Sequence, residues 1–331
     1  MSNSRLSWTL DWNHGSLELQ ALGGMLAPVR FALGEGRSLS PMQVAPWGEQ
    51  NDPALPGLLR RLRGEWPCVP FGRTTVPEGV PSDYARKVPD DNWDHGYASH
   101  HMWHLVAQGD SFLHAAIDYP EESPVSRLER RVSVDADSPS LTVLLRIHAR
   151  KPACLPIALH PTLAMPATGM VLEAPRHEGV FVYPVETEPG ISHLQAGARA
   201  DSLQRIPAID GPLDLTRLPL PFATEELLQL KDCKGPFILR YPGMHAELAL
   251  EWDTHVLPDV MLWISNGGRA YPPWNGRHFA LGIEPVCGFF DLGRVLVPPQ
   301  THPLAGRRGI AITPEAPVCI SYSMRARVAD C

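Results

Sequence analysis

The sequence predicts an all-β protein built as a large antiparallel β-sandwich, and three observations lead to this prediction. Thirty-five prolines and 27 glycines are spread over 331 residues. Proline is confined to turns, bulges and sheet edges, so this density indicates many short strands joined by stiff loops. Alternating apolar and polar residues recur along the chain, and no shift in composition marks a boundary. We therefore expect residues 1–331 to form a single domain.

The first part of the chain predicts a sheet edge followed by a loop. Residues 17–21 alternate between apolar and polar, Gly23-Gly24 predicts a turn, and residues 25–31 return as the second strand of a hairpin. Residues 37–56 are rich in Ser, Pro and Gly and predict a loop that leans over a site. Residues 58–63 predict a short helical turn.

The middle of the chain contains the clearest strand pattern. Residues 125–134 alternate, end at an aspartate-rich turn and continue into 141–148, which predicts an antiparallel pair. Residues 260–264 are continuously apolar, so we expect that strand to be buried on both faces. Residues 224–230 are the one segment that has some character of an amphipathic helix.

Charge and cysteine content restrict the function and the location. The net charge of −7 and the absence of a dense basic cluster oppose nucleic-acid binding and favour neutral or cationic small molecules. The six cysteines are far apart and predict reduced thiols rather than a disulfide framework. No segment is apolar enough to predict a signal peptide or a membrane span, so we expect a cytoplasmic protein.

His160 is the first candidate catalytic residue. It lies in the mostly apolar run 155–163, between Leu159 and Pro161. An imidazole in apolar surroundings can be uncharged near neutral pH and can exchange a proton with a substrate. A hydrogen-bonded core histidine is the structural alternative for such a position.

Glu284 is the second candidate. It is flanked by Ile283 and Pro285 in a strand-like apolar segment. A carboxylate is costly to bury, and burial would raise its pKa toward the range of a useful general base. Hydrogen bonding to loop amides is the structural alternative.

Histidines are densest in residues 94–105, which contain His95, His100, His101 and His104. If this segment is a strand, alternation separates His101 from His100 and His104. At most two of these three, together with His95, would then converge on a metal ion, so a metal enzyme is a weaker alternative.

Three short motifs in this order resemble the aldose 1-epimerase family, the sugar mutarotases of the galactose mutarotase-like β-sandwich. They are His95-Gly96-Tyr97 followed by Trp103, then Leu159-His160-Pro161, and then Ile283-Glu284-Pro285. The resemblance covers most of the chain and implies a galactose mutarotase-like supersandwich. Family members commonly have an Asn-Arg pair where this chain has Gly72-Arg73.

The resemblance implies an isomerase that interconverts the α and β anomers of a free sugar, without a metal or an organic cofactor. Glu284 would act as the base, His160 as the acid, and His95 would orient the substrate. Arg73 and Trp103 are further candidates for sugar binding. Asp259, at the start of the apolar strand 260–264, is a candidate because it could reach a pocket from the strand end.

Other functions remain open at this stage. A non-catalytic or regulatory sugar-binding protein could use the same scaffold, although pure binding does not need a protonatable pair. A glycoside hydrolase would need a second carboxylate paired with Glu284, and the sequence does not indicate one. Arg73, Arg269 and Arg277 are candidates for holding a phosphate if the sugar carries one.

Overall fold

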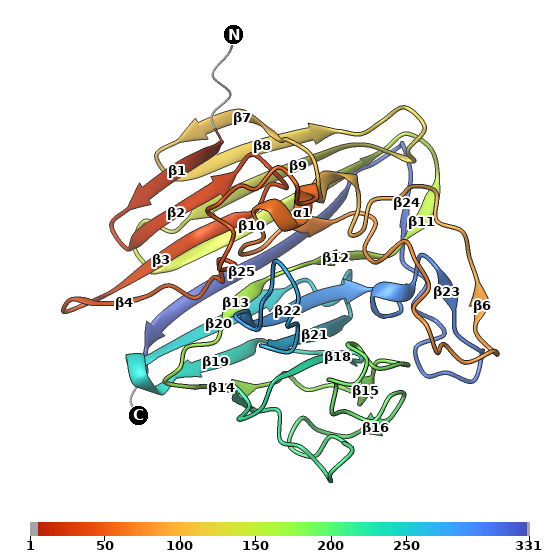
Figure 1. Ribbon diagram of the computed structural model, residues 1–331. Helices are drawn as coiled ribbons and strands as arrows, with labels where there is room; N and C mark the ends of the chain where they lie inside the picture. Colours follow the sequence, from red (N-terminus) through yellow and green to blue (C-terminus); the bar gives the residue numbers. More distant parts are fainter. Residues whose placement is uncertain (1–5, 330–331) are drawn as a thin grey trace.

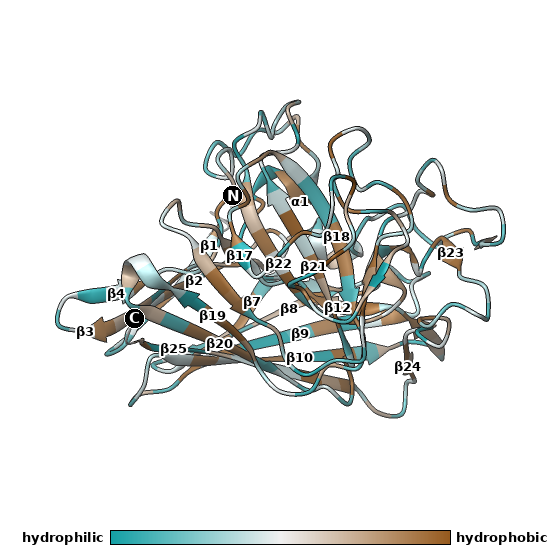
Figure 2. Ribbon diagram, turned by 90° about the horizontal axis from the view of Figure 1, so that it is seen from below, coloured by the Kyte–Doolittle hydropathy of each residue, from teal (hydrophilic) through white to brown (hydrophobic). Residues whose placement is uncertain are grey.

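Two large antiparallel sheets, one of nine strands and one of eight, form the body of the protein in the computed structural model (Figure 1). The structure describes residues 6–329. The two sheets are stacked as layers, which is seen from below in Figure 2. The predicted all-β sandwich is therefore confirmed.

The nine-stranded sheet runs from one edge to the other in the order β17 (Arg217–Leu218), β14 (Met170–Glu173), β19 (Phe237–Tyr241), β20 (Ala246–Trp252), β25 (Val318–Val328), β10 (Ser140–Ala149), β9 (Val125–Val134), β8 (Phe112–Asp118) and β7 (His104–Gly109). The eight-stranded sheet has the order β16 (Arg199–Ala200), β15 (Val180–Val182), β18 (Thr224–Leu230), β21 (Asp259–Asn266), β22 (Phe279–Cys287), β12 (Ile157–Leu159) and β5 (Pro67–Cys68), with β13 (Thr162–Ala164) also paired to β22.

Smaller elements complete the fold. A four-stranded sheet contains β1 (Ser7–Trp12), β2 (Gly15–Gln20), β3 (Leu26–Gly34) and β4 (Arg37–Leu39), so the predicted N-terminal hairpin is confirmed. Two-stranded pairs join β11 (Ala153–Leu155) to β24 (Ile310–Ile312) and β6 (Ala85–Arg86) to β23 (Leu296–Val297). The helical segments are short: α1 (Gly57–Arg60), as predicted, and the 3₁₀ turns η1 (Tyr97–Ser99), η2 (Pro242–Met244) and η3 (Phe290–Leu292).

The eight-stranded sheet has two different faces because its side chains alternate. On β22, Leu281 and Ile283 enter the main hydrophobic core between the sheets, which contains residues from Trp8 to Ala326. Glu284, the residue after Ile283, points to the other face. On β21 the same alternation sends Trp263 to that second face, where a separate apolar cluster lies. All eight residues of β21 are buried, as predicted.

Two predictions of local structure were wrong. Residues 224–230 form strand β18 rather than a helix. Leu228 and Leu230 alternate into the core, while Glu225 and Gln229 are buried with hydrogen-bond partners of their own. Residues 94–103 form turns and η1 rather than a strand. His95 and Gly96 both have left-handed backbone conformations, with φ values of 60° and 87°, which interrupt an extended chain. Across residues 6–329, no helix has the length and apolar character needed to cross a membrane.

Candidate functional site

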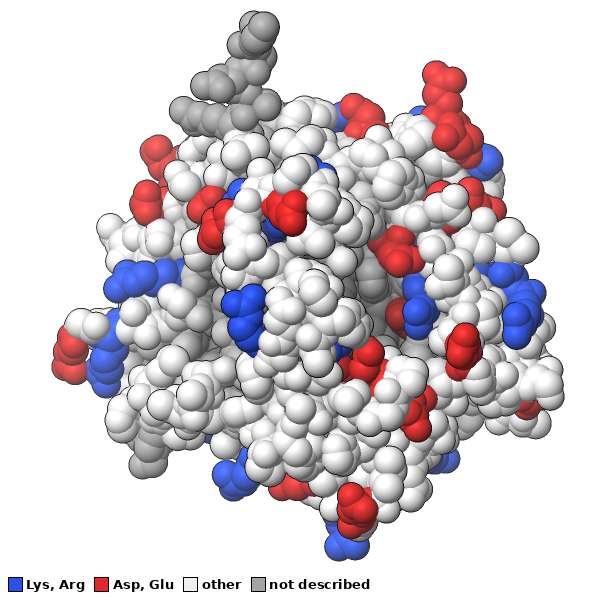
Figure 3. Space-filling view, in the orientation of Figure 1, with Lys and Arg blue, Asp and Glu red and all other residues white. Residues whose placement is uncertain are grey.

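A cavity of about 510 Å³ lies on the second face of the eight-stranded sheet. Its lining comes from the loop around α1, from residues 92–95, and from the neighbouring strands β18, β21 and β22. Figure 3 shows that this side of the molecule is hollowed, with acidic and basic side chains beside the hollow. The volume lies in the range of about 300–1,000 Å³ that is usual for small-molecule sites.

Glu284 lies in this cavity and is completely buried. Neither of its carboxylate oxygens accepts a hydrogen bond from any described residue. Burial raises the pKa of Glu284 well above its ordinary value, and the charge of Asp291 raises it further. The space beside the carboxylate exists because residue 282 is glycine: a Cβ atom there would lie 2.6 Å from Oε1 of Glu284. A buried carboxylate without partners is costly, which indicates a function.

His160 lies immediately after β12 and faces Glu284. Its Nε2 atom is 3.3 Å from Oε1 of Glu284, and its Nδ1 atom is 3.1 Å from the hydroxyl of Thr162. The imidazole stacks on the indole of Trp66, with ring centroids 4.0 Å apart. Burial, and then the nearby His95, lower the pKa of His160 well below its ordinary value. The imidazole is therefore held in place and is uncharged at neutral pH.

His95 lies against His160 in an edge-to-face arrangement, with ring centroids 5.4 Å apart. Burial lowers the pKa of His95 to about 4, so its ring is also neutral near pH 7. Its buried Nδ1 atom has no hydrogen-bond partner among the described residues. This nitrogen and the Glu284 carboxylate are thus two unpaired polar groups in one cavity, an arrangement that suits a polar ligand.

The cavity also contains a second cluster of polar side chains, those of Arg73, Tyr183 and Asp291. The hydroxyl of Tyr183 donates a hydrogen bond of 2.7 Å to Oδ1 of Asp291. Burial opposes the charge of Arg73, but the Asp291 carboxylate and the Tyr183 oxygen outweigh this effect and raise the pKa of Arg73. The cavity therefore contains a guanidinium and a hydrogen-bonded carboxylate as well as the Glu284–His160 pair.

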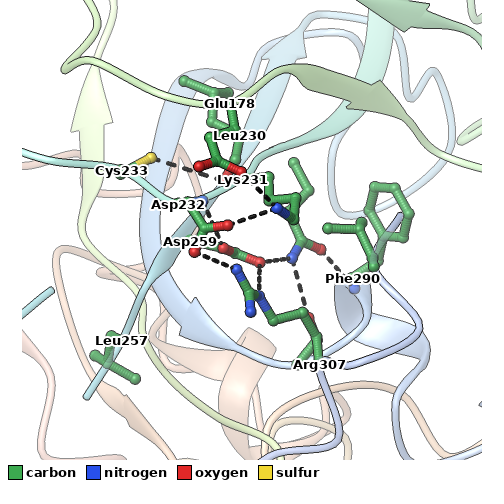
Figure 4. Close-up of polar contacts among 12 residues, drawn as sticks. Glu178, Leu230, Lys231, Asp232, Cys233, Leu257, Asp259, Phe290 and Arg307 are labelled. Atoms are coloured by element: carbon green, nitrogen blue, oxygen red, sulfur yellow. Dashed lines mark hydrogen bonds and ion pairs between the residues drawn. The ribbon is translucent and has the colours of Figure 1, made fainter. Parts of the chain in front are cut away.

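Two of the candidates from the sequence, Trp103 and Asp259, do not line this cavity. Trp103 is buried in the main core, where its Nε1 donates to the carbonyl of Ala98. Asp259 is buried at the start of β21, where it accepts hydrogen bonds from Gln229, Arg307 and the backbone of residue 232 (Figure 4). The segment of Trp103 is a turn rather than the expected strand, and its indole packs in the main core. Asp259 shares a face of β21 with Met261 and Trp263, but its carboxylate is already bonded by the three donors named above.

The histidine cluster does not converge. His100 lines the cavity, but its Nδ1 accepts from the backbone of Leu58 and its Nε2 bonds the carbonyl of Asp94. His101 instead stacks on Tyr97. In the part of the chain that the structure describes, no group of three His, Cys, Asp or Glu side chains is arranged to hold a metal ion.

Proteins of known structure share this architecture, although no protein-family model and no curated protein matches the sequence. Solved structures do match over nearly the whole chain. A candidate aldose 1-epimerase from Escherichia coli K12 is 18% identical, with a TM-score of 0.64 over 97% of this chain and 99% of that one. The fold is that of galactose mutarotase-like proteins.

Other matches agree with this fold. The Slr1438 protein from Synechocystis is 15% identical, with a TM-score of 0.65 over 98% of this chain and 97% of that one. The GalM/aldose epimerase homologue from C. elegans is 12% identical, with a TM-score of 0.61 over 98% and 99% of the two chains. At these identities the comparison establishes the galactose mutarotase-like fold alone.

Some cavity residues could not be singled out from the sequence. Trp263 was recognised as a strand residue, but its position at the cavity follows only from the register of β21 against β22. Arg269, in contrast, was named as a candidate for holding a phosphate; it lines the cavity, lies over the ring of Trp274 at 4.5 Å and contacts Glu188 at 3.4 Å, so it is already paired. Asp291 had no sequence signal at all, because it lies in a short turn after β22.

Proposed function

We propose that the protein is an aldose 1-epimerase-like isomerase that interconverts the α and β anomers of a free sugar. The observation that carries this proposal is the contact of 3.3 Å between Nε2 of His160 and the otherwise unpartnered carboxylate of Glu284 in a cavity of suitable size. The apolar surroundings disfavour two charges, so the pair shares one proton. Moving that proton from Glu284 to His160 creates a base and an acid together.

The reaction then proceeds without any redox change. The Glu284 carboxylate accepts the proton of the anomeric hydroxyl, and the His160 imidazolium gives its proton to the ring oxygen. The bond between C1 and the ring oxygen breaks as the C1 carbonyl forms. Rotation about the C1–C2 bond presents the other face of the C1 carbonyl. The hydroxyl formed from the former ring oxygen then attacks C1 on that face. Both protons then return by the reverse transfers, which leaves the protein unchanged.

Neighbouring groups support this chemistry. His95 is neutral and has an unpaired ring nitrogen, so it can bond a sugar hydroxyl without adding charge beside His160. Trp66 holds the imidazole by stacking. We also propose that the protein works in a reducing compartment such as the cytoplasm, since Cys68, Cys154, Cys233, Cys287 and Cys319 are free thiols.

A mutarotation assay tests the proposal. Crystalline α-galactose or α-glucose is dissolved with catalytic amounts of protein, and relaxation of the optical rotation is followed. We expect the wild type to accelerate relaxation and Glu284→Gln and His160→Ala to lose about 10²- to 10⁴-fold in kcat/KM. The exposed residues Glu251 and His255 provide matched controls, Glu251→Gln and His255→Ala.

The proposal fails if the wild type accelerates relaxation of no sugar in a broad panel of free and phosphorylated aldoses. Sugar binding without turnover, measured by calorimetry, would then favour a non-catalytic binding protein.

A further inference from the structure

Two of the carboxylates that line the cavity, those of Glu284 and Asp291, have contrasting surroundings. Glu284 receives no hydrogen bond from the described residues, whereas Asp291 accepts one from Tyr183 at 2.7 Å. Burial raises the pKa of both acids, but Arg73 and the Tyr183 bond oppose the effect only at Asp291. Asp291 is thus suited to remain an ion that accepts hydrogen bonds, while Glu284 is suited to exchange a proton. A carboxylate can accept several hydrogen bonds, so Asp291 retains capacity for a ligand.

The backbone around Asp291 is tied to the segment that carries Arg73. The amide of Arg73 donates to the carbonyl of Asp291 at 2.8 Å. Gly72 has a φ of 113°, and a Cβ atom there would lie 2.3 Å from that same carbonyl oxygen. A side chain at position 72 would therefore separate the two segments. This explains why glycine precedes Arg73 in this chain, and it makes Arg73 and Asp291 one structural unit.

A side chain from β18 also holds the turn that precedes Asp291. Gln229 on β18 donates through Nε2 to the carbonyl of Gly288 at 3.0 Å and accepts through Oε1 from the amide of Phe290 at 2.7 Å. The same Nε2 also donates to the buried carboxylate of Asp259 at 2.7 Å. That carboxylate accepts a second hydrogen bond, of 2.9 Å, from Arg307 (Figure 4). Phe290 has a φ of 44°, a conformation that non-glycine residues adopt only when their surroundings enforce it. The strained residue immediately precedes Asp291, so the turn is held in a defined position.

We propose that Asp291 is a further substrate-binding residue of this site, which accepts a hydrogen bond from a sugar hydroxyl other than the anomeric one. Tyr183 orients its carboxylate. The backbone amide of Arg73 holds its backbone carbonyl, and Gln229 is a positioning residue that fixes the turn before it. This inference rests on the proposed function, because it assigns a specificity role within the same cavity. Asp259, although remote from the cavity, contributes through Gln229.

The test compares Asp291→Asn with the wild type on the sugar that the enzyme accepts and on each monodeoxy derivative of that sugar. Loss of a charged hydrogen-bond acceptor should raise KM about 5- to 20-fold and leave kcat within about 3-fold. For the derivative that lacks the contacted hydroxyl, the two proteins should have the same KM. Tyr183→Phe and Gln229→Leu should show a weaker form of the same pattern, which a general loss of stability would not produce. The exposed Asp210 provides the matched control, Asp210→Asn.

Two results overturn the inference while the proposed function stands: an active enzyme in which Asp291→Asn has wild-type KM for every sugar, or one in which KM rises equally for the parent sugar and all derivatives. A wild-type protein that neither binds nor interconverts any sugar overturns the proposed function and the inference with it. If wild type binds without turnover, the same comparison is made on Kd, with the same pattern expected.

Discussion

Replacing Glu284 by glutamine should stabilise the protein while it removes activity. The wild-type carboxylate is completely buried and accepts no hydrogen bond from the described residues. At pH 8 the unfolded chain gains stability by ionising this group, whereas burial disfavours the ion in the native protein, and each unit of pKa difference costs about 1.4 kcal/mol. Glutamine has nearly the same shape but cannot ionise, so we expect Glu284→Gln to gain about 1–2 kcal/mol in the free energy of unfolding at pH 8.

The gain should depend on pH in a defined direction. The folded-state pKa of Glu284 is raised by burial above its value in the unfolded chain. Between these two values the native protein binds more protons than the unfolded chain, so stability falls as pH rises. Glu284→Gln removes this fall. Its advantage should therefore be largest at pH 8 and small at pH 4, below the unfolded-state pKa.

Thermal unfolding followed by circular dichroism measures this effect. With an unfolding entropy of about 2.1 cal/mol/K per residue over 331 residues, a gain of 1–2 kcal/mol corresponds to about 1–3 °C in Tm. The exposed variant Glu251→Gln should leave Tm unchanged at both pH values. A Tm for Glu284→Gln below that of the wild type at pH 8, or a gain that is equal at pH 4 and pH 8, would show that the carboxylate is satisfied and would refute the reasoning.

Three further predictions concern other positions. Gly282→Ala should lower kcat/KM about 100-fold or more with the fold retained, because its methyl group would displace the carboxylate of Glu284. A methyl group at Gly306 would meet no described atom within 4 Å, so the control Gly306→Ala should be fully active. Equal activities of the two variants would contradict the close approach of residue 282 to Glu284. Trp103→Phe should lower the free energy of unfolding, measured in urea, by about 1–3 kcal/mol and leave KM unchanged, because this indole packs in the core. A raised KM would show that Trp103 contributes to substrate binding after all. Burial lowers the pKa of His278 to about 3. As the pH falls from 6.5 to 4, the histidine takes up a proton in the unfolded chain but not in the native protein. The wild type should therefore lose about 3 kcal/mol in the free energy of unfolding from this group. His278→Phe should flatten that fall and His255→Ala should not, and parallel curves for all three proteins would contradict this assignment.

Much of the fold could be predicted because it depends on local patterns. Proline and glycine density, the alternating strand 125–134 and the apolar strand 260–264 all report how a residue sits relative to its neighbours, and period-two alternation is a property of the strand itself. The prediction of helical character for residues 224–230 was wrong because the glutamates of this segment look solvent-exposed in the sequence. In the fold they are buried against tryptophan, serine and backbone donors from other strands.

The same division applies to the site. Glu284 and His160 could be singled out because a charged or titratable residue in an apolar strand conflicts with burial unless it has a use. Their separation of 3.3 Å, however, depends on the pairing of β12 with β22, which brings residues 124 positions apart together. By itself the sequence determined the strand content and the two residues that carry the proposed chemistry. Only the tertiary structure decided that Asp291 lies in the cavity while Trp103 and Asp259 do not, since these placements depend on turns and inter-strand contacts that no local pattern encodes.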